Sequence, residues 1–110
     1  IIIDALFGFS LNGDPHSKEA QIIEQINCSQ TPVLSVDVPS GLDSHTGLAG
    51  DPIITANYTV TLGMLKKGLG KNYEVVGKLF IGDLGIPAQA YKDFHYDPPL
   101  FRGKSYISVN

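Results

Sequence analysis

The sequence predicts an α/β fold built around a mostly parallel β-sheet. Two short apolar segments rich in β-branched residues, 1–6 and 33–36, have the composition of buried parallel strands. Between them, residues 17–27 carry apolar side chains at helical spacing. A strand, a helix and a strand in this order form a βαβ unit with a right-handed crossover, so the two strands run parallel.

The first strand, Ile1 to Leu6, is apolar almost throughout, which is typical of a strand covered on both faces. Residues 8–15 are expected to form a loop. The helix from Ser17 to Asn27 is amphipathic because charged and amide side chains surround its apolar stripe. That stripe consists of Ala20, Ile22, Ile23 and Ile26. Thr31-Pro32 ends the connection, and the second strand runs from Val33 to Val36.

The second half of the chain adds further strands. Alternation from Tyr58 to Leu62 predicts the third strand, and Lys78 to Ile81 the fourth. Residues 40–52, with three glycines and other turn formers, predict a long loop, and long ordered loops at a sheet edge are often functional. Residues 63–77 contain four glycines and little helical periodicity, so we expect only loop there.

The C-terminal part is expected to pack over the domain. A short helix is predicted from Ala88 to Phe94. The segment from His95 to Asn110 is interpreted as a closing stretch, extended at Tyr106 to Val109. The sequence begins at Ile1, inside a predicted strand and without a methionine, so we expect the later part of a longer polypeptide.

Composition narrows the functional classes. With 110 residues, 43% of them hydrophobic, the chain suits one small globular domain or part of a larger one. The net charge is -3 and the basic residues are scattered, so we expect no nucleic-acid partner. No apolar run approaches the ~18 residues of a membrane-spanning helix, so no membrane partner is expected. The single cysteine, Cys28, fits a reducing compartment, and we expect an intracellular protein, cytoplasmic or mitochondrial. The sequence leaves open whether it forms a homodimer.

Two carboxylates follow the ends of predicted neighbouring strands. Asp4 closes the first strand and Asp37 follows the second, so both are expected at the edge where open α/β sheets bind ligands. For a lone Asp37, capping backbone amides in the turn Pro39-Ser40-Gly41 is the more common role. A second carboxylate at this edge favours a site, because a close pair can recruit a cation or serve acid–base chemistry.

Other polar residues have weaker signals. Ser40 lacks the Gly-x-Ser-x-Gly context of a nucleophile, and its oxygen suits a hard cation better, with a turn cap as the alternative. Gly8 stands where a loop could bring backbone amides to a phosphate, although a Gly-x-Gly-x-x-Gly motif is lacking. Lys66 and Lys67 are interpreted as a solvated pair, with a phosphate contact as the alternative.

The order of several short motifs is similar to that of a known family. The motifs are Asp4-Ala5-Leu6-Phe7-Gly8, Asp37-Val38-Pro39-Ser40-Gly41-Leu42-Asp43 with Gly47, Thr59-Val60-Thr61-Leu62, Lys66-Lys67-Gly68, Val76-Gly77-Lys78-Leu79-Phe80-Ile81 and Leu84-Gly85-Ile86-Pro87. Together they resemble the NAD(P)H-hydrate epimerase family, the YjeF N-terminal domain. The resemblance implies a Rossmann-like three-layer sandwich with a mostly parallel sheet. Residues 1–110 would be the C-terminal portion of one such domain, with the N-terminal portion absent from this chain.

The resemblance also implies a site. Family members epimerise the hydrated nicotinamide ring of damaged NADH or NADPH, with a potassium ion in the site. By resemblance, Asp4 and Ser40 would be potassium ligands and Asp37 would contact the substrate. A loop would line the nucleotide's phosphates, formed by Gly8, Phe9, Ser10, Leu11, Asn12, Gly13 and Asp14. The family's further potassium ligand, an asparagine in its earlier half, has no counterpart in this chain.

We therefore expect an isomerase that interconverts the R and S epimers of hydrated NADH or NADPH. The hydroxyl must leave and return, or the ring must open and close, so a carboxylate that gives and takes a proton is needed, and Asp37 is the candidate. The alternative is a non-catalytic binding or scaffold module with a protein or RNA partner, because the same domain occurs in an mRNA-decapping scaffold and in a protein that binds apolipoprotein A-I. The missing Gly-rich fingerprint disfavours an ordinary dehydrogenase.

Overall fold

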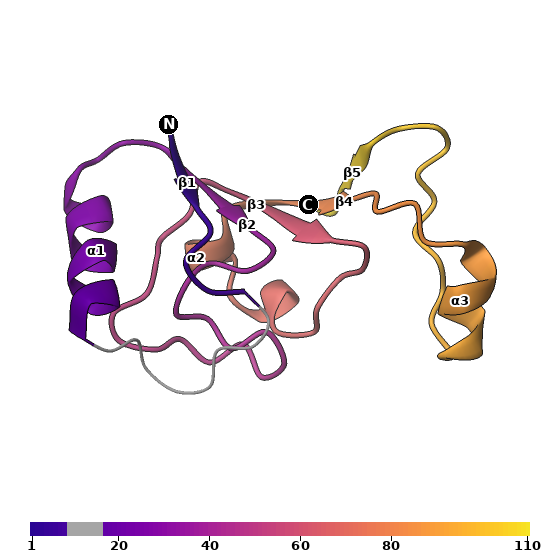
Figure 1. The fold of residues 1–110 in the computed structure, drawn as a ribbon, viewed down its shortest axis with the longest axis horizontal. Helices are drawn as coiled ribbons and strands as arrows, with labels where there is room; N and C mark the ends of the chain where they lie inside the picture. The colour runs from indigo at the N-terminus through magenta and orange to yellow at the C-terminus, as the bar shows by residue number, and fades with distance from the viewer. Residues whose placement is uncertain (9–16) are drawn as a thin grey trace.

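A computed structural model describes residues 1–8 and 17–110. Its centre is a five-stranded sheet in the order β1-β2-β3-β4-β5 (Figure 1). The strands are β1 (Ile2–Asp4), β2 (Val33–Val36), β3 (Tyr58–Leu62), β4 (Lys78–Gly82) and β5 (Tyr106–Ser108). Strands β1 to β4 pair in parallel and β5 pairs antiparallel to β4. The predicted α/β class and the mostly parallel sheet are therefore confirmed.

In the described residues, four short or medium helices lie between these strands. They are α1 (Ser17–Cys28), the 3-10 helix η1 (Leu69–Lys71), α2 (Tyr73–Val76) and α3 (Ala88–Asp93). The predictions for α1 and α3 are confirmed to within a residue at their ends. The prediction of loop alone over residues 63–77 is wrong, because η1 and α2 lie there. Leu69 and Val76 are fully buried, so tertiary packing sustains two short helical turns that glycine content disfavours.

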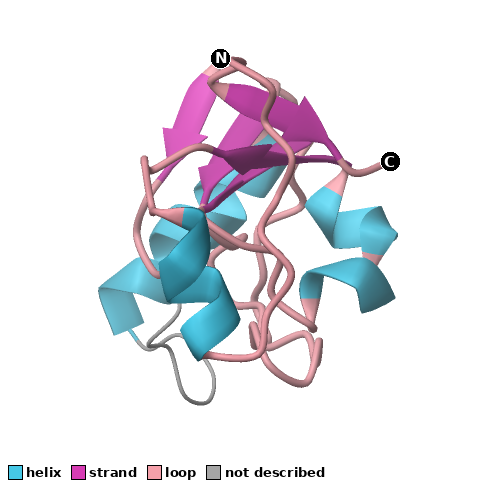
Figure 2. Cartoon of the chain, turned by 90° about the vertical axis from the view of Figure 1, so that its right-hand side faces the viewer, coloured by secondary structure: helices cyan, strands magenta, loops and turns pink. Residues whose placement is uncertain are grey.

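The described helices all lie on one side of the sheet (Figures 1 and 2). Strand residues that face them are buried, whereas their neighbours on the opposite face are more open, with Ile3 56% and Tyr58 38% exposed. The buried set is Asp4, Val33, Ser35, Thr59, Thr61, Leu79 and Ile81. The expectation that the first strand is covered on both faces is therefore wrong for the described residues. They supply a sheet and one helical layer, two of the three expected layers.

Two apolar clusters fill the covered face. One gathers Val38, Leu42, Leu69, Val76 and Leu79 beneath the middle of the sheet, and the other joins Ile23 of α1 to Val33, Ile54 and Ala56. Each fully buried aliphatic side chain contributes roughly 1.5–3 kcal/mol relative to an exposed one. These clusters hold the loop after β2 against the sheet, which fixes the backbone that carries the polar residues described below.

The predicted long loop after β2 is ordered by its own backbone. The amide of Gly50 donates to the carbonyl of Gly41 at 2.8 Å, and the amide of Ile54 donates to the carbonyl of Ser40 at 2.9 Å. Gly41 has φ 102°, and a Cβ at this position would lie 2.7 Å from the carbonyl oxygen of Pro52. Glycine is therefore required after Ser40, because both the backbone conformation and the close approach exclude a side chain.

No helix in the described ranges is long and apolar enough to span a membrane.

Candidate functional site

Asp4 is a buried carboxylate at the end of β1. Asp4 is only 1% exposed. Its side chain lies beside Ser35 of β2, its partner in the parallel register. Oδ2 accepts hydrogen bonds from Ser35 Oγ at 2.7 Å and from the Ser40 amide at 2.9 Å, and Oδ1 accepts one from Ser40 Oγ at 2.6 Å. Within residues 1–8 and 17–110, only neutral donors contact this carboxylate. Among the described residues, the carboxylate is thus stabilised by hydrogen bonds from neutral groups.

Ser40 links Asp4 to the chain that follows β1. Its hydroxyl donates to Asp4 and accepts a hydrogen bond from the Phe7 amide at 2.9 Å, and Oγ also lies 3.4 Å from the Phe7 carbonyl oxygen. A carboxylate, a hydroxyl and a carbonyl oxygen therefore meet at one point. All three are oxygen donors of the kind that hard cations prefer, so the residues present fit such an ion. In the described part of the chain, no cluster of three or more His, Cys, Asp or Glu side chains that could hold a metal ion is found.

Asp37 lies immediately after β2 in a left-handed backbone conformation, with φ 70°. Aspartate tolerates this region better than most residues, but it still costs on the order of 1 kcal/mol, and such residues are concentrated at functional sites. Its amide donates to the Val60 carbonyl at 2.8 Å, which ties the turn to β3. The conformation aims the side chain at the end of β3 rather than into the turn that follows.

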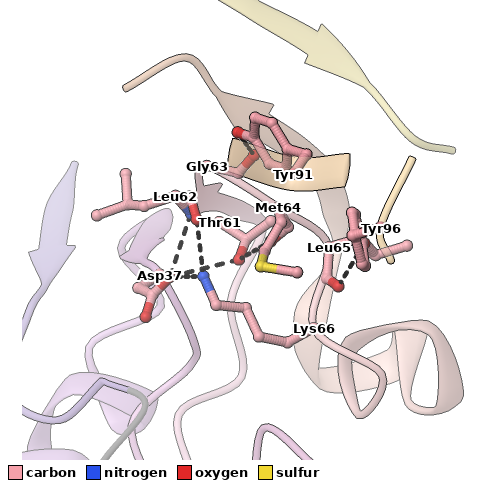
Figure 3. A network of polar contacts seen from close by, with 9 residues as sticks. All are labelled: Asp37, Thr61, Leu62, Gly63, Met64, Leu65, Lys66, Tyr91 and Tyr96. Carbon is pink, nitrogen blue, oxygen red and sulfur yellow. Dashed lines mark hydrogen bonds and ion pairs between the residues drawn. The ribbon is translucent and has the colours of Figure 1, made fainter. Parts of the chain in front are cut away.

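The two oxygens of Asp37 have different surroundings. Oδ1 accepts hydrogen bonds from the Leu62 amide at 3.1 Å and from Thr61 Oγ1 at 3.4 Å, and it forms an ion pair with Lys66 (Figure 3). Oδ2 receives no hydrogen bond from the described residues and points away from this group (Figure 3). A Cβ on Gly8 would lie 3.5 Å from Oδ2, so the backbone of Gly8 passes beside the open oxygen.

The structure brings the predicted residues together at one sheet edge in two adjacent groups. Asp4 and Ser40 form the first group, and Asp37 and Gly8 form the second. The expectation that both carboxylates lie at the carboxyl ends of neighbouring parallel strands is confirmed. Asp37 is not the cap of the Pro39-Ser40-Gly41 turn, since its hydrogen bonds go to β3 and the loop after it. The predicted loop positions Phe9, Ser10, Leu11, Asn12, Gly13 and Asp14 lie outside the described residues.

Lys66 is the residue that sequence reasoning missed. The interpretation of Lys66 and Lys67 as a solvated pair is wrong for Lys66, whose side chain is 16% exposed and ion-paired with Asp37. Its Nζ also donates to the Leu62 carbonyl at 2.9 Å. Lys67 is exposed. A lysine shortly after β3, at the same edge as Asp37, could have indicated an ion pair with that carboxylate. Because Lys66 and Lys67 are adjacent, the sequence alone did not show which of them forms it.

Asp43 stabilises the loop rather than the site. Its Oδ1 accepts the amides of Thr46 at 2.7 Å and His45 at 2.9 Å. The hydrogen bond from the Thr46 amide, followed by that from His45, lowers the pKa of the Asp43 carboxyl. Asp43 thus organises the bend that follows the Asp37–Ser40 segment.

Comparisons with known proteins show the family of the chain. The family described as YjeF-related protein N-terminus matches residues 1–68. An NAD(P)H-hydrate epimerase of Dehalogenimonas lykanthroporepellens is 40% identical over 91 residues, which are 83% of this chain and 36% of that protein. One of Plasmodium knowlesi is 35% identical over 111 residues, covering 99% of this chain and 37% of that protein.

A similar structure is also known. The crystal structure of yeast ynu0 superposes with a TM-score of 0.85 at 26% sequence identity, covering 98% of this chain and 46% of the yeast chain. The chain thus spans well under two thirds of the length of these similar proteins. On the match over residues 1–68, the chain belongs to the family of the YjeF-related protein N-terminus.

Proposed function

We propose that the protein containing this chain is an NAD(P)H-hydrate epimerase, which interconverts the R and S epimers of hydrated NADH or NADPH. The observation that carries the proposal is Asp37, which has a left-handed backbone and a carboxylate held through Oδ1, while Oδ2 lies beside Gly8 and accepts no hydrogen bond from the described residues. Similar proteins named NAD(P)H-hydrate epimerase support the choice of substrate. Residues 1–110 would form the C-terminal portion of a single domain of this family.

Asp37 is proposed as the group that moves the proton. Epimerisation at the hydrated ring carbon requires the hydroxyl to leave and return, or the ring to open and close, and either route needs proton transfer at oxygen or nitrogen. A carboxylate performs this role when one oxygen is free to reach the substrate and the other is fixed. Among the described residues, the arrangement at Asp37 has this form, and Gly8 itself places no side chain beside Oδ2.

Potassium is proposed as the ion of the Asp4 and Ser40 group. The carboxylate of Asp4, the hydroxyl of Ser40 and the carbonyl of Phe7 supply oxygen ligands, and the burial of Asp4 among neutral donors favours a cation beside it. When bound, the ion supplies a fixed positive charge for polar groups of the substrate. Ser40 would hold the segment after β1 in place with or without the ion, through its hydrogen bond from the Phe7 amide.

The substrate's phosphates are proposed to bind the loop of residues 8–14. The support is the position of Gly8 at the start of this loop and beside Asp37. An intracellular location, cytoplasmic or mitochondrial, belongs to the same proposal, because hydrated NADH and NADPH arise where these cofactors are used.

A non-catalytic binding module is the competing function, since folds host unrelated functions. A scaffold has no chemical need for a strained carboxylate with one open oxygen, so the geometry of Asp37 favours the enzyme. The test is to incubate the full-length protein with an unequal mixture of R and S hydrates and to follow their ratio. An enzyme speeds the relaxation of the ratio to equilibrium without hydride transfer. With a binding module, the ratio relaxes only at the rate measured without protein.

A further inference from the structure

The carboxylate of Asp37 is fixed asymmetrically. The ion pair with Lys66, the Leu62 amide and the Thr61 hydroxyl all reach Oδ1, while Oδ2 receives no hydrogen bond from residues 1–8 or 17–110 (Figure 3). Lys66 is the only charged member of this group. The amide and hydroxyl bonds are long, at 3.1 and 3.4 Å, so the charged contact is the strongest restraint on the orientation of the carboxylate.

The segment that carries Lys66 is itself held in place. The hydroxyl of Tyr91, on α3, donates to the Gly63 carbonyl at 2.7 Å, and that of Tyr96 donates to the Leu65 carbonyl at 3.0 Å (Figure 3). Burial raises the pKa of the Tyr91 hydroxyl from its ordinary value, so this group loses its proton less readily than an exposed tyrosine. Lys66 Nζ donates to the Leu62 carbonyl at 2.9 Å as well as to Asp37, so two acceptors hold the end of its long side chain.

We propose that Lys66 is a positioning residue for Asp37, a role that rests on the proposed epimerase function of that site. Lys66 binds Oδ1 and so keeps Oδ2 turned toward Gly8, where the substrate would lie. The two side chains of this ion pair are each only 16% exposed, so solvent and salt screen it less than a surface pair. Ordering a lysine side chain costs rotamer entropy, and the two acceptors of Lys66 Nζ, Asp37 Oδ1 and the Leu62 carbonyl, offset that cost in the one geometry that restrains the carboxylate. Lys66 does not need to touch the substrate to act in this way.

Kinetics of single and double variants test the role. Lys66→Met should lower kcat about 10²-fold, the usual cost of a misplaced catalytic group, with KM within about threefold. Lys66→Arg, which can still donate to Oδ1, should have a kcat at least about tenfold higher than that of Lys66→Met. In an Asp37→Asn background, Lys66→Met should lower the rate less than about threefold, since residues that act as a unit are not additive. Lys67→Met, at the neighbouring exposed lysine, is the matched control and should retain the wild-type rate.

Other outcomes overturn the proposal. A large rise in KM with kcat unchanged would mean that Lys66 binds the substrate directly. Full additivity of Lys66→Met and Asp37→Asn would mean that the two residues act independently. A loss of kcat that follows the unfolded fraction, measured by thermal unfolding, would assign Lys66 to stability alone.

A second measurement decides the role of Lys66 even if the full-length protein proves not to be an epimerase. The side-chain carboxyl carbon of Asp37 is identified by NMR from the resonance that disappears in Asp37→Asn. Its chemical shift should change in Lys66→Met well beyond any change in Lys67→Met, because of these two lysines it is Lys66 that bonds the carboxylate. An unchanged resonance in Lys66→Met overturns the positioning role, whereas absence of epimerase activity with a shifted resonance overturns the proposed function alone.

Discussion

Replacement of Asp4 tests how much of the local fold depends on one buried carboxylate. Asp4 accepts three short hydrogen bonds, at 2.6, 2.7 and 2.9 Å, two of them from Ser40. Hydrogen bonds to a charged acceptor contribute about 1.5–3 kcal/mol each. In Asp4→Ala, the two serine hydroxyls can turn to other partners, but the buried Ser40 amide is left without an acceptor.

The gain from not burying a charge offsets part of this loss. We therefore expect Asp4→Ala to lower the free energy of unfolding by about 3–4 kcal/mol. Asp4→Asn keeps one oxygen for the Ser40 amide and should cost only about 1–2 kcal/mol. The ranking of the two variants follows directly from the amide, which cannot rotate away as a hydroxyl can.

Urea denaturation followed by circular dichroism measures these differences, with m-values checked for constancy. Asp97→Asn, at an exposed position, is the control and should change the free energy of unfolding by less than ~0.5 kcal/mol. An Asp4→Ala variant within about 1 kcal/mol of wild type would refute the reasoning, because its hydrogen bonds would then contribute nothing net. Equal losses for Ala and Asn would refute the assigned role of the Ser40 amide.

Three further predictions follow from the site and its loop. Gly8→Ala should fold normally, since its Cβ would lie at an ordinary 3.5 Å from Asp37 Oδ2, but the added methyl should obstruct that oxygen and lower kcat/KM about tenfold or more. Potassium should raise Tm above its value in sodium at equal ionic strength, and Ser40→Ala should abolish the difference, because an ion that binds only the folded state stabilises it. Asp43, whose pKa is lowered in the folded state, contributes stability that is fully present above its ordinary value of 3.8 and is lost as pH falls through the folded pKa, so the Tm difference between wild type and Asp43→Asn should shrink below about pH 3.8.

Each of these has an outcome that contradicts it. Unchanged kcat/KM in Gly8→Ala would place the substrate away from Oδ2. Equal Tm values in potassium and sodium for the wild type would remove potassium from the proposal. Parallel Tm curves for wild type and Asp43→Asn from neutral pH to about pH 2 would show that the Thr46 and His45 amides do not hold the Asp43 charge.

Local sequence patterns were sufficient to predict the strands and the helix that position the site. Apolar runs on both sides of an amphipathic helix predicted β1, α1 and β2, and parallel strands necessarily bring Asp4 and Asp37 to one edge. The turn chemistry after Asp37 predicted an ordered loop. These features depend on neighbours in sequence or on a simple rule of topology, so they can be predicted from the sequence.

The partner of Asp37 could not be predicted in this way. Lys66 is 29 positions away, and Lys67 beside it is chemically identical. The choice between them depends on the path of the chain after β3, which hydroxyls of Tyr91 and Tyr96 fix from a distant part of the sequence. Likewise, η1 and α2 exist because Leu69 and Val76 are buried in the core, and that burial is a property of the whole fold.

The central claim is that Asp37 carries out epimerisation through its open oxygen. The most direct test is the relaxation of an unequal mixture of R and S hydrated NADPH by wild type and by Asp37→Asn, since asparagine tolerates the same φ and retains an Oδ1 acceptor. The account predicts relaxation by wild type and a loss of about 10²–10⁴-fold in the variant, which should still be folded at the assay temperature. Relaxation by Asp37→Asn at the wild-type rate would contradict it.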